Sequence, residues 1–148
     1  MKGHGPALGE PLPPDWAGHP PQMSANDMNL WVRFRESYAQ EFKNFYFDCH
    51  VGDPVLEAPD LEEEMQRVVE AVSRRRIDVV GEKENEWWLI ELRQNAGPGA
   101  IGSILTYKTL WEEDPPDKRL VTPIIVTDYT DKNLVRVCSK LNIIYLLV

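Results

Sequence analysis

A hairpin pattern in the middle of the chain limits most strongly what this sequence can fold into. Residues 77–80 and 87–92 are rich in β-branched, aliphatic and aromatic side chains, which is typical of strands. The segment between them is charged and contains Asn85, a residue type that tolerates turn conformations. These features predict two antiparallel strands joined by a tight turn that is centred between Glu84 and Asn85.

The predicted turn places Asp78 directly opposite Glu91 on the neighbouring strand. Side chains alternate between the two faces of a strand, so both carboxyl groups are expected to project from one face. Like charges at paired positions, with Cβ atoms about 4.5 to 5.5 Å apart, destabilise a sheet. A divalent cation would explain the pair, because Mg²⁺ binds one or two carboxylates plus waters and substrate phosphates. The alternatives are an ordinary exposed acidic pair and a register shifted by one residue, which separates the two side chains.

Around these residues the sequence resembles the PD-(D/E)xK nuclease superfamily. Its members carry an Asp on one strand and Glu-x-Lys on the next, at the edge of a mixed sheet. Here Asp78 matches the Asp, and Glu91-Leu92-Arg93 matches Glu-x-Lys with Arg in place of Lys. The resemblance covers residues 43–148 and implies an α/β fold of the restriction-endonuclease type, with a mixed β-sheet flanked by helices.

The resemblance also implies a site for DNA cleavage. In it, Asp78 and Glu91 would hold Mg²⁺, and Arg93 would stand where the superfamily lysine orients water and neutralises charge. Arginine is too firmly protonated to act as a base, and its planar fork is suited to bridging both carboxylates in place of a metal. We therefore expect a degenerate catalytic site with little or no DNA cleavage, unless Lys108 substitutes for the missing lysine.

The overall charge argues against a protein that holds nucleic acid mainly by charge. The chain carries a net charge of −8, whereas such proteins are usually basic. A nucleic-acid contact would need a local basic patch, for which the candidates are Arg74, Arg75, Arg76 and Lys108. The arginine cluster is suited equally to binding phosphates and to neutralising residues 62–64, which are all glutamates.

Hydrophobic periodicity predicts further helices and strands around the hairpin, all within one domain of residues 23–148. The helix that begins at Asp60 is expected to bury a stripe of apolar residues, and so is the helix at 132–141. Cys49 and Cys138 fall in apolar surroundings and are expected to be buried free thiols. The other expected elements are a helix at 24–42, a strand at 43–51, a helix at 96–111, a strand at 120–126 and a last buried strand at 143–148. The residues expected to be buried are Leu61, Met65, Val68, Val69 and Val72 in the first helix and Leu134, Val135, Val137, Cys138 and Leu141 in the second.

Residues 1–22 form an extended tail that is rich in Pro and Gly and cannot bury enough apolar area to order itself. We expect another protein chain to hold it, through Trp16 together with Pro11, Pro13 and Pro14. The sequence shows no apolar run of membrane-spanning length and no signal peptide. A location in the cytoplasm or within a virus particle is expected.

Two classes of function remain. The missing lysine, the acidic charge and the tail favour an assembly protein that kept a nuclease fold, because a fold does not fix a function. The leading helix, rich in Trp and Tyr, makes the chain resemble small proteins of tailed bacteriophages. That resemblance implies an adaptor or connector-type virion component in a homo-oligomer or ring. The alternative is a Mg²⁺-dependent DNA endonuclease.

Overall fold

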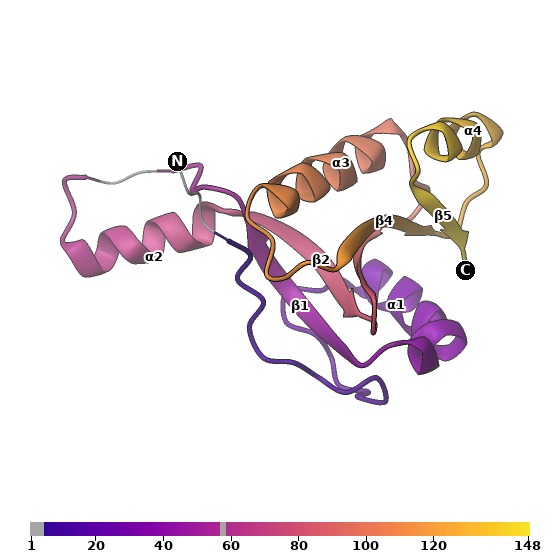
Figure 1. Cartoon of the computed structure of the whole chain (residues 1–148), viewed down its shortest axis with the longest axis horizontal. Helices are drawn as coiled ribbons and strands as arrows, with labels where there is room; N and C mark the ends of the chain where they lie inside the picture. The colour runs from indigo at the N-terminus through magenta and orange to yellow at the C-terminus, as the bar shows by residue number, and fades with distance from the viewer. Residues whose placement is uncertain (1–4, 57–58) are drawn as a thin grey trace.

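A computed structural model of the chain describes residues 5–56 and 59–148 (Figure 1). Within this part of the chain, a five-stranded mixed sheet is flanked by helices, which confirms the predicted α/β class. The helices are α1 (Ala25–Tyr38), α2 (Glu63–Ser73), α3 (Pro98–Glu113) and α4 (Lys132–Lys140), with a short 3-10 turn, η1 (Ala39–Glu41), after α1. The strands are β1 (Asn44–Val51), β2 (Arg75–Glu82), β3 (Glu86–Leu92), β4 (Leu120–Thr127) and β5 (Ile144–Leu147).

The strands lie in the order in which they occur in the chain, β1-β2-β3-β4-β5. β1, β2 and β3 pair in antiparallel fashion, whereas β3, β4 and β5 are parallel. Parallel neighbours need a crossover connection, and here α3 joins β3 to β4 while α4 joins β4 to β5. The change from antiparallel to parallel pairing therefore falls at β3, the strand that carries Glu91.

The register of the hairpin is the one that the sequence predicts. Val79 pairs with Ile90, Val80 with Leu89, and Gly81 with the bulky Trp88. A Cβ atom added at Gly81 would lie 2.5 Å from a ring carbon of Phe42, so the position has no room for a side chain. The turn and the close packing of this glycine against the Phe42 ring thus both favour the observed register of the hairpin.

Each face of the sheet has its own hydrophobic layer. One layer packs against α3 and α4 and includes Ile104, Trp111 and Leu134, whereas the other packs against α1 and is centred on Trp31 and Phe34. In Figure 1, α3 and α4 lie above the sheet and α1 lies below it. Cys49 and Cys138 are buried and free, as predicted.

The apolar stripe of α2 is not buried, contrary to the prediction. Leu61, just before the helix, is 44% exposed, and Met65 and Val68 are each 50% exposed. Val69 is half-buried, and the side chain of Val72 lies outside the described residues. The pattern identified a helix correctly, but α2 projects away from the sheet (Figure 1) and has no sheet face to cover.

The C-terminal elements are also less buried than predicted. In α4, Leu134 and Cys138 face the core, whereas three apolar residues that were expected to be inward are about two-fifths exposed. β5 was expected to be a buried strand, but it lies at the edge of the sheet and exposes Ile144 and Leu147. A short helix beside an edge strand can cover only one side of it. The three exposed residues that were expected to face inward in and directly after α4 are Val135, Val137 and Leu141.

The N-terminal segment lies along the edge of β1. Ala7 pairs with His50 and Leu12 with Phe45, through backbone hydrogen bonds of 2.8 to 3.2 Å. The ring of Trp16 lies 5.5 Å from that of Phe47. β1 of the same chain thus supplies backbone partners to this segment, and its binding by another protein chain stays a prediction. No helix in the described part of the chain is long and apolar enough to cross a membrane.

Candidate functional site

The two carboxyl groups that the sequence predicts to face each other meet where the ladder between β2 and β3 ends. Pairing runs as far as Val79 and Ile90, and one residue further Asp78 Oδ2 accepts a hydrogen bond of 2.9 Å from the backbone N–H of Leu92. The carboxyl groups of Asp78 and Glu91 lie within hydrogen-bonding reach of each other. Glu91 is 4% exposed, so the contact forms away from bulk water.

Burial raises the pKa of both carboxyl groups of this pair. Burial, and then the charge of Glu91, raises the pKa of Asp78 to about 8. Burial also raises the pKa of Glu91, although the neighbouring Arg93 guanidinium acts in the opposite direction. The pair therefore retains a proton near neutral pH, and a bound cation would displace that proton.

Arg93 does not bridge the two carboxylates, contrary to the prediction. Its Nη2 donates to Glu91 Oε2 and, at 3.4 Å, to the hydroxyl of Ser103 on α3. Arg93 and Glu91 are two residues apart, which turns both side chains toward the α3 side. Asp78 interacts with Arg93 through charge alone. The side chain of Arg93 is 40% exposed, so part of its guanidinium remains accessible.

Tyr107, one turn after Ser103 on α3, completes this side of the site. Its hydroxyl is hydrogen-bonded to Ser103, and burial raises its pKa, as do the charges of Glu91 and Asp78. The hydroxyl is therefore protonated at neutral pH and can donate. The sequence analysis assigned these two residues no role, because a helix with small residues also packs closely on a sheet.

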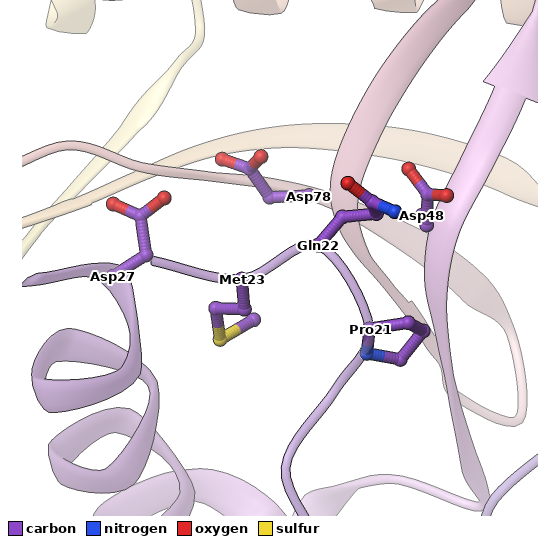
Figure 2. Close-up of a pocket in the computed structure, with 6 residues that line it drawn as sticks. All are labelled: Pro21, Gln22, Met23, Asp27, Asp48 and Asp78. Carbon is purple, nitrogen blue, oxygen red and sulfur yellow. The ribbon is translucent and has the colours of Figure 1, made fainter. Parts of the chain in front are cut away.

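A cavity of about 30 Å³ opens onto Asp78 from the α1 side (Figure 2). Holding a water needs roughly 10–15 Å³, so this cavity can accept one or two waters or a small ion. Asp78, Asp27 at the start of α1 and Asp48 on β1 approach it from three elements (Figure 2). The remaining lining residues are Pro21, Gln22 and Met23.

The position of Asp48 depends on an irregularity in β1. Its φ angle is 54°, in the left-handed region. Phe47 packs in the layer on the α1 side and Cys49 in the layer on the α3 side, whereas regular alternation would place both on one face. Asp48 also forms an ion pair of 3.5 Å with Arg76. No feature of the sequence marks this change of face, so the sequence does not predict that Asp48 approaches Asp78.

The described residues form no cage of three or more His, Cys, Asp or Glu side chains around a metal position. Asp78 and Glu91 instead provide a pair of carboxylates. Such a pair suits Mg²⁺, which keeps several waters and takes further oxygens from substrate phosphates. The buried, proton-sharing pair fits a hard divalent cation, although the metal role of both residues remains a prediction.

The basic residues proposed for nucleic-acid contact do not act as one patch. Arg74 donates to the carbonyl oxygens of Gly52 and Gly5 at 2.6 and 2.7 Å, and Arg76 pairs with Asp48. Arg75 is exposed and lines a cavity of about 250 Å³ together with Ser103 and Tyr107. Lys108 pairs with Glu112 at 2.9 Å, so it does not reach back to the carboxylates.

The tail residues predicted to bind a partner differ in exposure. Trp16 and Pro14 are half-buried, whereas Pro11 and Pro13 are exposed. A role of these four residues in binding another protein stays a prediction.

Comparisons with known proteins support the fold. The chain matches no family model and no curated protein. A solved structure described as a repair endonuclease from Pyrococcus abyssi superposes on it with a TM-score of 0.52 and 15% sequence identity. The match covers 89% of this chain and 49% of that chain, so the present chain spans about half the length of that endonuclease. At this identity the likeness shows the fold alone: a nuclease-like α/β domain with a mixed five-stranded sheet flanked by helices.

Proposed function

We propose that this protein is a metal-dependent nuclease, with Asp78 and Glu91 at its catalytic centre. The observation that carries the proposal is the contact between the half-buried Asp78 and the buried Glu91, whose pKa values are both raised. Burying two like charges together is costly unless a proton or a cation neutralises them. The nuclease-like fold supports the same interpretation, since a repair endonuclease shares it.

Asp78 and Glu91 are the residues that would hold the divalent cation. When bound, such an ion supplies an activated water and stabilises the charge that develops at phosphorus. The hydrogen bond from the Leu92 N–H fixes one oxygen of Asp78, so the sheet backbone positions this carboxylate in advance.

Arg93 would stabilise negative charge on the phosphate under attack. It contacts Glu91 and Ser103 through the single atom Nη2, whereas a guanidinium carries five N–H donors. Its planar fork suits two oxygens of a phosphate. Arg93 cannot accept a proton at neutral pH, so the water must lose its proton to another group or to solvent.

Tyr107 and Ser103 act as positioning residues. The Tyr107 hydroxyl is hydrogen-bonded to Ser103, and the Ser103 hydroxyl accepts from Arg93. These contacts hold the Arg93 guanidinium against α3 and keep it from moving toward Asp78.

One argument for the assembly role is weaker, because the tail has backbone partners within its own chain. The argument for lost catalysis is weaker too, because Arg93 contacts Glu91 without bridging it to Asp78. An adaptor or connector role in a virus particle, and a homo-oligomer or ring, remain predictions.

The test is a cleavage assay with Mg²⁺ or Mn²⁺ on supercoiled plasmid, on duplex oligonucleotides and on single-stranded oligonucleotides. The wild type is expected to cut at least one of these substrates. Asp78→Asn and Glu91→Gln should each reduce the rate at least about 100-fold, because a catalytic metal supplies several kcal/mol of stabilisation. Glu82→Gln is the matched control, since Glu82 lies on the same strand as Asp78 and pairs with Arg119 at 2.9 Å. A wild type that cuts none of the substrates would return the assembly role to first place.

A further inference from the structure

A larger cavity, of about 490 Å³, lies between the N-terminal segment and β1. Its size falls within the roughly 300–1,000 Å³ that is usual for small-molecule sites. Pro21 also lines the small cavity at Asp78, so the two cavities share a wall. The larger cavity, here named the Trp16 groove, is lined by Glu10, Leu12, Trp16, His19, Pro21 and Phe47.

Aromatic rings line the Trp16 groove. Trp16 lies 5.5 Å from Phe47 with an angle of 43° between the rings, and Phe47 lies 5.2 Å from the buried Trp31. Trp16 is half-buried, whereas Trp31, Trp87, Trp88 and Trp111 are at most 7% exposed. Arg35 donates to the carbonyl oxygen of Trp16 at 3.4 Å and helps to hold this residue. A half-buried indole thus lines the groove beside a second aromatic ring.

We propose that the Trp16 groove binds an unpaired nucleobase of the substrate strand by stacking on Trp16. This inference rests on the proposed nuclease function and specifies its substrate. None of the described residues that line the groove is Lys or Arg, so the groove is not built for a phosphate. Glu10 and His19 instead supply a carboxylate and an imidazole at its edge, which can accept and donate hydrogen bonds to a base.

The expected substrate class follows from the chemistry of stacking. Every base has a π-face, so stacking on an aromatic side chain is tolerant of sequence. The bases inside a duplex already use both faces and must be unstacked before they can enter such a groove, which costs a few kcal/mol. The groove therefore favours a substrate with unpaired nucleotides beside the cut, such as a single strand or a flap.

Binding can be measured separately from cleavage. We suggest titration with an oligothymidylate of about ten nucleotides, within the usual site size of single-strand binders, in EDTA so that nothing is cut. Fluorescence anisotropy of a dye-labelled oligothymidylate measures binding by every variant, because it does not use Trp16 as the reporter. In the wild type, quenching of tryptophan fluorescence adds a direct report on Trp16, which is the one tryptophan that is not buried. Trp16→Leu keeps an apolar side chain but removes the ring, and it should weaken binding about tenfold. Trp16→Phe should bind more tightly than Trp16→Leu.

Leu120→Ala is the matched control, because Leu120 is 78% exposed and does not line the groove. Melting curves of each variant show whether the N-terminal segment is still in place. Equal binding by the wild type and a folded Trp16→Leu, or a duplex that binds as tightly as the single strand, would overturn the proposal.

The outcomes separate the two proposals. Ring-dependent binding of the oligothymidylate without cleavage of any substrate supports the groove and overturns the nuclease function. Cleavage that is unaffected by Trp16→Leu supports the nuclease and overturns the groove.

Discussion

The carboxylate of Asp78 accepts a hydrogen bond of 2.9 Å from the backbone N–H of Leu92, one step beyond the last residue pair between β2 and β3. A side chain thus occupies a place where a backbone carbonyl would ordinarily continue the ladder. The backbone of the sheet therefore holds the carboxylate of Asp78 in place. The chain has consequently fixed a carboxylate beside Glu91 at a cost in stability.

Replacing Asp78 should show this cost directly. In Asp78→Asn the amide oxygen can still accept from Leu92, while the buried charge beside Glu91 is gone. We expect a higher melting temperature at pH 8 than for the wild type, by ~2–4 °C for each kcal/mol gained in a chain of this length. Glu82→Gln provides the contrast, because hydrogen bonds from Asn44 and Arg119 lower the pKa of Glu82 against the effect of burial. A melting temperature for Asp78→Asn below that of Glu82→Gln would contradict the prediction.

Stability in the absence of metal should fall as the pH rises. The pKa of Asp78 is about 8 in the folded chain, well above its ordinary value of 3.8. A carboxyl group with a raised folded-state pKa contributes stability at low pH that is lost as the pH rises through that value. We therefore expect denaturant midpoints to decrease between about pH 4 and pH 8 and to level off above that range, and Ca²⁺ to oppose the decrease by binding the ionised pair. A pH dependence that is unchanged in Asp78→Asn would assign it to other groups.

Arg93 should be needed for cleavage but not for metal binding. Arg93→Ala is expected to lower the rate about 100-fold or more, as the loss of a charge-stabilising donor does. Calorimetry with Ca²⁺ should still detect binding, because Asp78 and Glu91 remain. The cleavage rate of Arg93→Lys should lie between those of the wild type and Arg93→Ala, since lysine keeps the charge but loses the planar fork. Lys108→Ala is the control, because Lys108 pairs with Glu112, and it should cut like the wild type.

Deleting residues 1–18 should lower the melting temperature by several degrees. The deletion removes the pairs Ala7–His50 and Leu12–Phe45, and it takes from Arg74 its acceptor at Gly5. A tail held only by a partner chain would instead leave the melting temperature nearly unchanged and weaken assembly. Scanning calorimetry together with size-exclusion chromatography decides between these outcomes.

Two glycines should respond in opposite directions to alanine. A Cβ at Gly81 would lie 2.5 Å from Phe42, so Gly81→Ala should destabilise the fold by ~1–3 kcal/mol. A Cβ at Gly102, inside α3, meets nothing within 4 Å, and Gly102→Ala should stabilise by ~0.5–1 kcal/mol. Urea unfolding measures both changes. Equal effects of the two substitutions would contradict the close packing at Gly81.

The sequence predicted the hairpin well because its information is local. A charged turn at Asn85 and a two-residue alternation fix which residues pair, so the register from Glu82–Trp87 to Val79–Ile90 followed from the pattern. The ladder ends one residue before Asp78 and Glu91, so their predicted strand pair is not part of it. Helix positions followed from periodicity in the same way. The nuclease-like fold followed from the order of these elements together with a short motif.

The features that the sequence did not predict depend on distant parts of the chain. The left-handed backbone at Asp48 has no local marker, so the approach of its carboxylate to Asp78 was missed. The apolar residues of α2 recur with the period of a buried helix. This period does not reveal whether a sheet packs against the helix, and Met65 is in fact exposed. Arg93 turned to Ser103 because α3 lies there, which is a property of the packed structure.

The two edges of the sheet differ in whether another segment of the chain pairs with them. At β1, the N-terminal segment occupies backbone groups at Ala7–His50 and Leu12–Phe45. At the other edge, β5 is the last strand and exposes Ile144 and Leu147. An extended peptide that pairs with this sheet would have to displace the N-terminal segment at β1. At β5 none of the described segments would block it. Any growth of the sheet through β-augmentation would therefore be directional, from the C-terminal edge outward.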